Sequence, residues 1–312
     1  MSKCEANLIA FTGNNLLPVI RAAESVLFIF GAGMSVDSGI PDYRSSGGWY
    51  REDGPFTRIG KTAFMMFVRS ELEADWSRAW GLLGYQQAVI SRAKPHAGYT
   101  LLAGEATQNP TCVFVITSNV DELALRAGFP PERVHQCHGS IFRLQCSVPC
   151  SRETWPMPDE PLDIDVENFL VKGSLPLCPF CGAVARPNVY FFGDSEESYV
   201  SEGSQVTAER FSSWIAERKN TELLMVEIGC GLGAPGLRRR AEQYLAEYPR
   251  SWLIRINDSA AMGPPERFIG IQARALQALN TSAGETAAKR GDMMRDCNAI
   301  SRFRYCAAAK HL

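Results

Sequence analysis

The sequence lacks an excess of charge of either sign. Its 312 residues include 32 Lys and Arg and 34 Asp and Glu, which leaves a formal net charge of −2. Binding to a nucleic-acid backbone is driven by counterion release at a basic surface, so we expect no sequence-specific nucleic-acid partner, although the chain from Lys289 onward is locally basic. The cationic run at 237–240 is interpreted as a solvated helix face, because adjacent side chains on a helix point in different directions.

Long hydrophobic runs are also missing. The apolar runs, such as 26–30 and 112–116, are far shorter than the roughly 20 residues that a transmembrane helix requires. The first 20 residues contain no charged stretch followed by a long apolar one, which a secretion signal needs. We therefore expect a soluble, cytoplasmic protein without a membrane partner; a nuclear location stays open.

Internal repeats are absent, and a composition of 46% hydrophobic and 21% charged residues is typical of a globular protein. At roughly 100 to 200 residues per domain, the length allows about two domains. Short apolar runs alternate with amphipathic stretches, a pattern typical of strands that crossover helices bury on both faces. The sequence thus predicts an α/β fold with a doubly wound parallel sheet. The expected central strands are 26–30, 112–116, 223–228 and 252–256.

Ten cysteines make a high count for a reducing compartment, so their spacing has to indicate their role. Two close pairs, Cys146 with Cys150 and Cys178 with Cys181, lie in one irregular segment. Four thiolates on two such turns suit tetrahedral Zn²⁺ in a closed structural site. The alternatives are four unligated thiols, or a redox pair at Cys178 and Cys181.

A motif with chemical content follows the first expected strand directly. The string G-A-G-M-S from Gly31 places small residues where backbone N–H groups can approach a pyrophosphate. It is not a regular G-x-G-x-x-G, because Val36 occupies the third glycine position, and a tight turn is the alternative interpretation. Asp42 and Arg44 add a carboxylate and a fork-shaped phosphate partner. Together these residues indicate a dinucleotide site.

The longer string from Gly31 to Ser45, G-A-G-M-S-V-D-S-G-I-P-D-Y-R-S, closely resembles the signature of the sirtuins, the NAD-dependent protein deacylases. Further matching blocks follow in the order that this family requires, and together they span roughly residues 26–279. The blocks are 117–121, 138–140, the two cysteine pairs, 186–194, 229–232 and 256–258.

The resemblance implies a Rossmann-like sheet with a helical insertion and a smaller zinc-binding module. The expected NAD-binding domain comprises 1–47, 95–140 and 187–280. The helical insertion is expected at 48–94 and the zinc module at 141–186. A frayed or disordered tail is expected at 281–312.

By resemblance, the activity is removal of an acyl group from lysine, with NAD as co-substrate, structural zinc on the two cysteine pairs, and an acyl-lysine protein or peptide as partner. His138 would act as general base on the ribose hydroxyls, and Asn119 would orient the ribose or a water. Asp121 and the backbone near Ile40 would hold the nicotinamide amide. The implied products are free lysine, nicotinamide and O-acyl-ADP-ribose. The residues expected to bind NAD are Gly31, Ala32, Gly33, Ser35, Ile40, Asp42, Tyr43, Arg44, Ser118, Asn119, Asp121, Gly229, Cys230, Gly231, Asn257 and Asp258.

The position of His138 supports its catalytic role independently. It follows an apolar stretch, and Asn119 and Asp121 stand at the end of another expected strand, where open α/β sheets bind ligands. A histidine has an ordinary pKa of about 6.5, which suits proton abstraction near neutrality. The neighbouring His135 is interpreted as structural.

Three departures from the family fall inside the expected NAD site. Ser118 stands where the family has Gln, Cys230 and Gly231 where it has Thr-Ser, and Tyr43 where it has Phe. Each departure changes a hydrogen-bonding group, and a lost bond costs about 0.5 to 1.5 kcal/mol. We therefore expect weaker NAD binding with the catalytic set retained.

The acyl preference follows from two further positions. Sirtuins that prefer acidic acyl chains resemble one another in a Tyr and an Arg, three residues apart, ahead of the position of Pro95. Counting back without gaps places these at Leu83 and Gln86, and neither can pair with a carboxylate. The resemblance thus implies a preference for neutral acyl groups such as acetyl, with Leu83 as apolar lining.

Two other functions stay open at this point. An ADP-ribosyltransferase or NAD glycohydrolase would keep the glycine loop and the cleavage of nicotinamide but deliver the ribose elsewhere. A non-catalytic NAD- or ADP-ribose-binding module would leave its ligand unchanged. His138 together with the cysteine module favours the deacylase.

Overall fold

The structure is a computed structural model that describes residues 16–43, 45, 47–51 and 67–280. Three features expected from the sequence lie outside these residues: Arg44 as an NAD ligand, the part of the helical insertion at 52–66, and the tail at 281–312.

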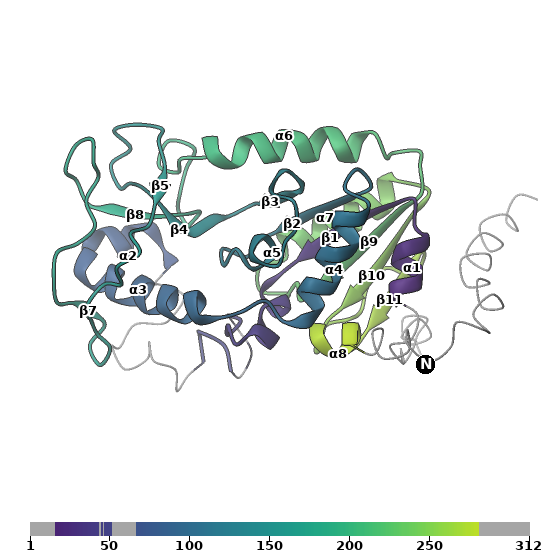
Figure 1. Ribbon diagram of the computed structural model, residues 1–312, viewed down its shortest axis with the longest axis horizontal. Coiled ribbons are helices and arrows are strands. Elements are labelled where there is room, and N and C mark those ends of the chain that lie inside the picture. The colour runs from purple at the N-terminus through teal and green to yellow at the C-terminus, as the bar shows by residue number, and fades with distance from the viewer. Residues whose placement is uncertain (1–15, 44, 46, 52–66, 281–312) are drawn as a thin grey trace, which may run out of the picture.

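Six strands form one parallel sheet: β1 (Ser25–Phe30), β2 (Val113–Thr117), β3 (Val134–Gln136), β9 (Leu223–Ile228), β10 (Ser251–Ile256) and β11 (Phe268–Ile271). Their order is β11-β10-β9-β1-β2-β3 (Figure 1). This confirms the α/β class with a doubly wound parallel sheet. The four expected strands match β1, β2, β9 and β10 to within one residue. The edge strands β3 and β11, of three and four residues, were too short for the hydrophobic pattern to reveal.

Helices bury both faces of this sheet, because successive side chains of a strand point to opposite sides. On β1, Phe28 and Phe30 pack into one apolar cluster, whereas Leu27 and Ile29 pack into another. The first face is covered by α1 (Leu16–Ala22), α4 (Ala97–Gln108), α5 (Leu123–Arg126) and α8 (Ala275–Asn280), and the second by α6 (Glu202–Ala216) and α7 (Gly236–Glu247). In the part of the chain that the structure describes, no helix is long and apolar enough to span a membrane.

The other end of the molecule combines two helices with two small antiparallel sheets (Figure 1). Its elements are α2 (Arg69–Ala74), α3 (Trp76–Arg92), the sheet of β5 (Trp155–Pro156), β4 (Gly139–Cys146) and β8 (Ala185–Val189), and the hairpin of β6 (Ile164–Asp165) and β7 (Leu170–Val171). Helix α3 is joined to β8 by the Trp80 indole, which donates to the carbonyl oxygen of Ala185 at 2.8 Å. The expected domain limits stay a prediction.

Three short 3₁₀ turns complete the described elements: Ala32–Met34, Val36–Ser38 and Pro131–Arg133. The first two follow β1 directly, so that the glycine motif forms tight turns before the chain leaves the sheet.

Glu227 of β9 and Arg255 of β10 form an ion pair between neighbouring strands of the sheet. Both side chains are fully buried, and the guanidinium donates to the two carboxylate oxygens at 2.7 and 2.8 Å. A second carboxylate group also contacts Arg255: Oε1 of Glu242, on α7, lies 2.9 Å from its Nη1. Burial raises the pKa of Glu227, and the hydrogen bonds from Arg255 oppose that shift. Removal of one partner from such a pair leaves a buried charge with less compensation.

Glu227→Leu is therefore expected to lower the free energy of unfolding by about 3 to 5 kcal/mol. Glu217→Leu is the matched control, because Glu217 pairs with Arg218 while its own side chain is 72% exposed, and exposed pairs contribute about 0 to 1 kcal/mol. Urea unfolding followed by circular dichroism measures both variants. Equal losses in the two variants would contradict the assigned role of the buried pair.

Candidate active site

The sequence motifs meet at one edge of the six-stranded sheet, where its parallel strands end. Gly31 follows β1, Ser118 follows β2, Gly229 follows β9 and Asn257 follows β10. Open α/β sheets bind their ligands outside the carboxyl ends of the strands. This edge is therefore the candidate site.

Three glycines bring two of these loops into backbone contact. A Cβ atom on Gly31 would lie 2.6 Å from the carbonyl oxygen of Gly229, and one on Gly33 would lie 2.7 Å from its Cα. Gly229 itself has a φ of 70°, and its Cβ would lie 2.3 Å from the amide nitrogen of Met34. The Gly33 amide donates to the Gly229 carbonyl at 3.0 Å. This packing alone requires glycine at all three positions.

Behind the glycine loop, four polar side chains form a buried network. The Ser35 hydroxyl donates to Oδ2 of Asp121 at 2.6 Å and lies 3.0 Å from the Tyr99 hydroxyl. Nδ2 of Asn119 donates to the Ser35 hydroxyl at 3.1 Å and to the Gly31 carbonyl at 3.0 Å. The network thus ties the ends of β1 and β2 to α4.

Burial dominates the electrostatics of this network. It raises the pKa of the Asp121 carboxyl, and hydrogen bonds from Ser35 and from the amide of Leu123 oppose the shift. Burial, followed by the charge of Asp121, raises the pKa of Tyr99 well above its ordinary value and that of Tyr43 to about 12. Both phenols therefore keep their protons near neutral pH.

A shallow pocket that is open to solvent lies against the network. Six residues that the sequence singled out for NAD line it: Ala32, Ser35, Ile40, Tyr43, Asn119 and Asp121. The other lining residues are Pro41, Trp49, Gln86, Ile90 and Val120. Because Gln86 and Ile90 belong to α3, this helix forms one wall of the pocket, and the other lining residues come from the segments that follow β1 and β2.

The two expected acyl-site residues separate in the structure. Gln86 lines the pocket, whereas Leu83 is buried in the apolar cluster that α2 and α3 share with Leu144 and Ala185. Positions four apart lie on one helix face, so Gln86 and Ile90 face the pocket together. Leu83 therefore does not line the described pocket.

His138 stands between β3 and β4 and outside the lining of the pocket. Its ring hydrogen-bonds to the backbone of Ser118, which precedes the pocket residue Asn119. The residue is exposed to solvent, yet the surrounding protein desolvates the ring and lowers its pKa, and the bond to Ser118 opposes that shift. A neutral imidazole able to accept a proton is the result. By contrast, Nδ1 of His135 pairs with the Thr207 hydroxyl at 3.1 Å.

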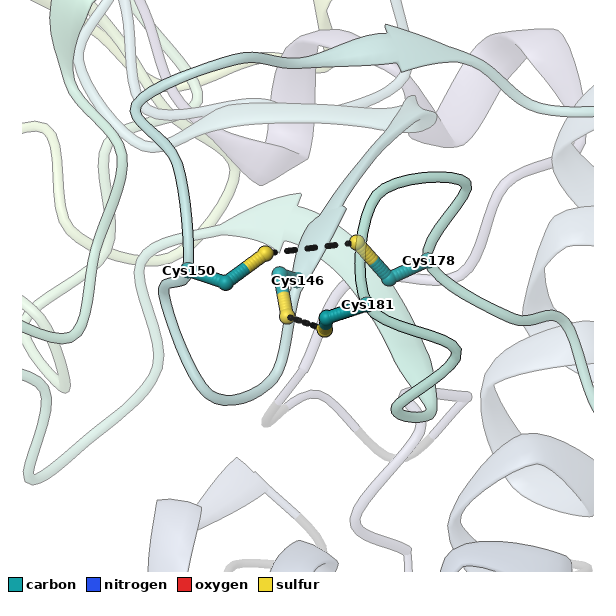
Figure 2. Close-up of side chains that lie close together, drawn as sticks. All are labelled: Cys146, Cys150, Cys178 and Cys181. Atoms are coloured by element: carbon teal, nitrogen blue, oxygen red, sulfur yellow. Dashed lines mark hydrogen bonds between the residues drawn. The ribbon is translucent and has the colours of Figure 1, made fainter.

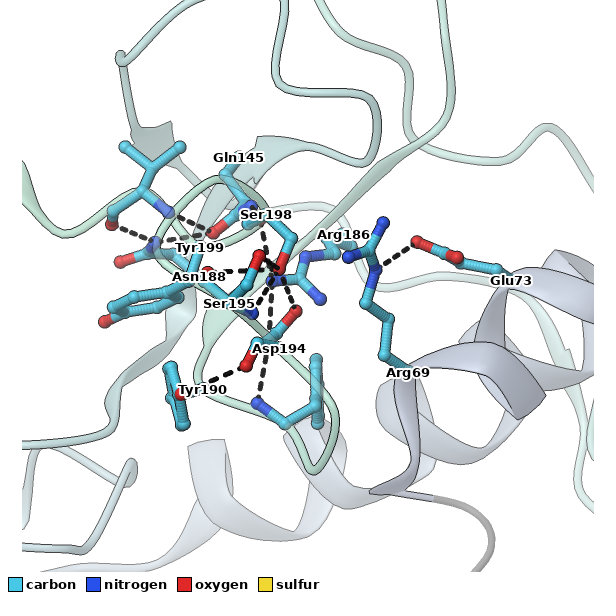
Figure 3. A network of polar contacts seen from close by, with 12 residues as sticks. Arg69, Glu73, Gln145, Arg186, Asn188, Tyr190, Asp194, Ser195, Ser198 and Tyr199 are labelled. Atoms are coloured by element: carbon cyan, nitrogen blue, oxygen red, sulfur yellow. Dashed lines mark hydrogen bonds and ion pairs between the residues drawn. The ribbon is translucent and has the colours of Figure 1, made fainter.

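Residues 186–194 contribute to a network of polar contacts (Figure 3) and contact the backbone of His138. The Tyr190 amide donates to the carbonyl oxygen of His138 at 3.0 Å. In the same segment, Arg186 and Asp194 form a buried ion pair at 2.9 Å, and the Ser198 hydroxyl donates to Asp194 at 2.9 Å. These buried polar contacts fix the backbone that carries the histidine.

The loops after β9 and β10 hold the remaining expected NAD residues. The Cys230 side chain turns into the apolar cluster under α6 and α7, and burial raises the pKa of its thiol well above the ordinary value. Asn257 is also turned inward: its Nδ2 donates to the Cys230 carbonyl at 3.1 Å, and its Oδ1 accepts from the Ala260 amide at 2.8 Å. Gly231 and Asp258 are exposed. Cys230 and Asn257 therefore hold the two loops in shape, whereas Gly231 and Asp258 face solvent.

The turn after the glycine motif carries an aromatic residue that the sequence analysis missed. Asp42 holds the turn by accepting from the Ser45 hydroxyl at 2.7 Å. The Trp49 amide donates to the Asp42 carbonyl at 2.7 Å, and the Tyr50 amide donates to the Tyr43 carbonyl at 2.9 Å. This pairing brings Trp49 to the pocket. No periodic pattern in the sequence indicates that Trp49 would lie there.

The start of α4 carries two more site residues that the sequence analysis missed. Nε2 of His96 contacts the Met34 carbonyl at 2.9 Å, and its Nδ1 accepts from the Gly98 amide at 3.0 Å. Burial lowers the pKa of His96, so the neutral ring caps the helix. Tyr99, one turn further on, reaches Ser35. A polar residue at a helix start is a capping signal that would have drawn attention to this position.

The four paired cysteines form one cluster (Figure 2). The sulfur atoms of Cys146 and Cys181 are 3.6 Å apart, as are those of Cys150 and Cys178, and all four lie within 4.8 Å of one another. A tetrahedral zinc with Zn–S bonds of about 2.3 Å has sulfur–sulfur edges of about 3.8 Å. The spacing of the sulfur atoms fits such a site.

Comparison with known proteins identifies relatives of this chain. The family model described as the Sir2 family matches residues 31–226. An NAD-dependent protein deacylase 2 of Pseudomonas aeruginosa is 33% identical over 174 residues, which is 55% of this chain and 62% of the relative. An NAD-dependent protein deacylase of Pyrococcus furiosus is 32% identical over 177 residues, 56% of this chain and 64% of the relative. The chain thus matches less than two thirds of the length of these relatives.

Solved structures show the same fold. A Sir2 homologue in complex with NAD has a TM-score of 0.61 at 20% identity and covers 86% of this chain and 92% of its own. A Sir2 variant with a deacetylated p53 peptide and 3′-O-acetyl ADP-ribose has a TM-score of 0.60 at 20% identity, covering 87% and 97%. Since the family model matches more than half of the sequence, the chain belongs to the Sir2 family.

Proposed function

We propose that this chain is an NAD-dependent protein lysine deacylase that acts on acyl-lysine proteins or peptides in the cytoplasm and forms nicotinamide and O-acyl-ADP-ribose. One observation carries the proposal: the Ser35–Asn119–Asp121 network opens into a pocket, and His138 hydrogen-bonds to the residue that precedes Asn119. The names of the relatives fit this activity and not the alternative of an ADP-ribosyltransferase or NAD glycohydrolase.

The residues of the pocket fit the nicotinamide end of NAD. The lining beside Asp121 is largely apolar, with Ile40, Pro41 and Trp49, and suits a flat aromatic ring. Each oxygen of Asp121 accepts one hydrogen bond from the protein, and a carboxylate oxygen has a second lone pair that can accept from a carboxamide N–H. The donor set therefore supports a carboxamide in this place.

When bound, NAD would supply the ADP-ribosyl group and the nicotinamide leaving group. Asp121 would hold the carboxamide, and Asn119, fixed by Ser35 and the Gly31 carbonyl, would orient a hydroxyl or a water beside it. His138 would take the proton from a ribose hydroxyl, for which its neutral ring is ready near pH 7. Much of the remaining catalysis would come from positioning.

The departures at Ser118 and Gly231 support weaker NAD binding. Ser118 is half-buried and offers a short hydroxyl, while Gly231 is exposed and has no side chain. Each missing hydrogen bond would cost about 0.5 to 1.5 kcal/mol. The buried network around Ser35 contains neither residue, so the catalytic set is unaffected.

His138→Ala is expected to lower kcat for deacylation by about 10²- to 10⁴-fold. NAD binding should change little, because His138 lies outside the pocket lining. His135→Ala is the matched control, since His135 pairs with Thr207, and should retain most of the rate. Release of nicotinamide with an acetyl-lysine peptide measures the effect, and normal turnover by His138→Ala would refute the mechanism.

The pH profile tests the same residue. Desolvation lowers the pKa of His138 below its ordinary value of about 6.5. The base form therefore persists to lower pH than for a free histidine, and kcat/KM should be constant near neutrality and fall only below about pH 6.5. An acid limb centred above that pH would contradict this assignment.

The cysteine cluster is proposed to hold one structural zinc per chain. Cys178→Ala combined with Cys181→Ala should abolish zinc binding and unfold this part of the protein, because half of the ligands are removed. Cys112→Ala is the control, since Cys112 lies outside the cluster. Metal analysis and thermal unfolding measure both variants, and retention of stoichiometric zinc by the double variant would disprove the assignment.

Neutral acyl groups are proposed as the preferred substrates. Among the described residues that line the pocket there is no Lys or Arg, and Asp121 contributes a carboxyl. A succinyl carboxylate placed there would be unpaired at a cost of several kcal/mol. We expect kcat/KM to be at least tenfold higher, about 1.4 kcal/mol, for an acetyl-lysine peptide than for its succinyl counterpart. Equal efficiency would overturn this preference.

A further inference from the structure

Gln86 is a buried residue whose side-chain amide has no hydrogen-bond partner among the residues that the structure describes. It lies on α3, is 4% exposed and lines the pocket. Within the described residues no hydrogen bond reaches its amide. Neither polar atom of this amide is among the buried, unsatisfied atoms of the described residues, so the amide stays open to the pocket that Gln86 lines and is available for a ligand.

Two other polar side chains of the pocket, those of Ser35 and Asn119, are committed to the buried network, and Asp121 is the proposed contact of nicotinamide. The Ser35 hydroxyl donates to Asp121 and accepts from Nδ2 of Asn119, which also donates to the Gly31 carbonyl. On the side of Gln86, the pocket is lined by apolar and aromatic side chains, including Ile90. Only Gln86 therefore adds an uncommitted amide to the α3 wall of the described pocket.

We propose that Gln86 recognises a hydroxyl group on the acyl chain of the substrate, so that a hydroxyacyl-lysine is preferred over an alkyl acyl-lysine of the same length. This inference rests on the proposed deacylase function. A carboxamide both donates and accepts hydrogen bonds, and a hydroxyl complements it in both directions. The group recognised is uncharged, because the described lining offers no cation and Asp121 lies in the same pocket.

The carboxamide of nicotinamide is the other ligand group that an amide can recognise. The proposed contact for that group is Asp121, which belongs to the sheet edge and not to α3. The acyl chain is therefore assigned to Gln86, and a nicotinamide contact is treated as an outcome of the test.

The experiment compares a 3-hydroxybutyryl-lysine peptide with the butyryl-lysine peptide of the same sequence. The wild-type enzyme should favour the hydroxyacyl peptide in kcat/KM by about three- to tenfold, the size expected for one net hydrogen bond. Gln86→Met keeps the length of the side chain without its amide and should remove or reverse this ratio. Gln87→Met is the matched control: the same change on the next residue, outside the pocket lining, should keep the ratio of the wild type.

Three results would overturn the inference. The first is a wild-type ratio at or below one. The second is an equal loss on both peptides by Gln86→Met with a raised KM for NAD, which would place the amide against nicotinamide. The third is an unchanged ratio in Gln86→Met.

A separate measurement distinguishes failure of the deacylase proposal from failure of the role proposed for Gln86. If no acyl peptide releases nicotinamide, the deacylase function is wrong, and calorimetric titration of the same two peptides decides the role of Gln86. Tighter binding of the hydroxyacyl peptide that is lost in Gln86→Met and kept in Gln87→Met would support recognition by Gln86. Equal or absent binding of the two peptides would refute it.

Discussion

The contact between the backbones of Gly31, Gly33 and Gly229 is the constraint on which the site depends. The loops after β1 and β9 approach so closely that any Cβ atom at these three positions would lie less than 3 Å from backbone atoms of the other loop. Gly229 also needs its left-handed φ of 70°. Because this contact fixes where the chain leaves β1, it also fixes the position of Ser35, four residues after Gly31.

Ser35 connects this backbone contact to the buried polar network of the site. Its hydroxyl lies among Asp121, Asn119 and Tyr99, which come from the end of β2 and from α4. A buried polar network of this kind stabilises one arrangement only when its members are satisfied, since an unpaired member in a low dielectric is costly. The same desolvation raises the pKa of Asp121. Packing and reactivity are thus set by the same few contacts.

The sequence predicted what depends on local pattern. The central strands were found because both of their faces are buried, and the motifs fell at strand ends, which every parallel sheet brings to one edge. Side chains placed by long-range packing were not found. Trp49 reaches the pocket through pairing of its turn with Asp42. Arg238, expected on a solvated face, is buried and donates to the carbonyls of Ala260 and Met262, because the chain after β10 folds over α7.

The residues proposed for chemistry and the residue proposed for acyl selectivity come from different parts of the fold. The sheet edge supplies Ser35, Asn119 and Asp121, whereas α3 supplies Gln86 and Ile90. Helix α3 is positioned by the cysteine-containing part through the bond from Trp80 to Ala185, the first residue of β8. In the proposed enzyme, a metal on the cysteines would therefore act on the substrate indirectly, by holding the helix that carries Gln86, whereas Ser35, Asn119 and Asp121 are held by the loops at the edge of the sheet.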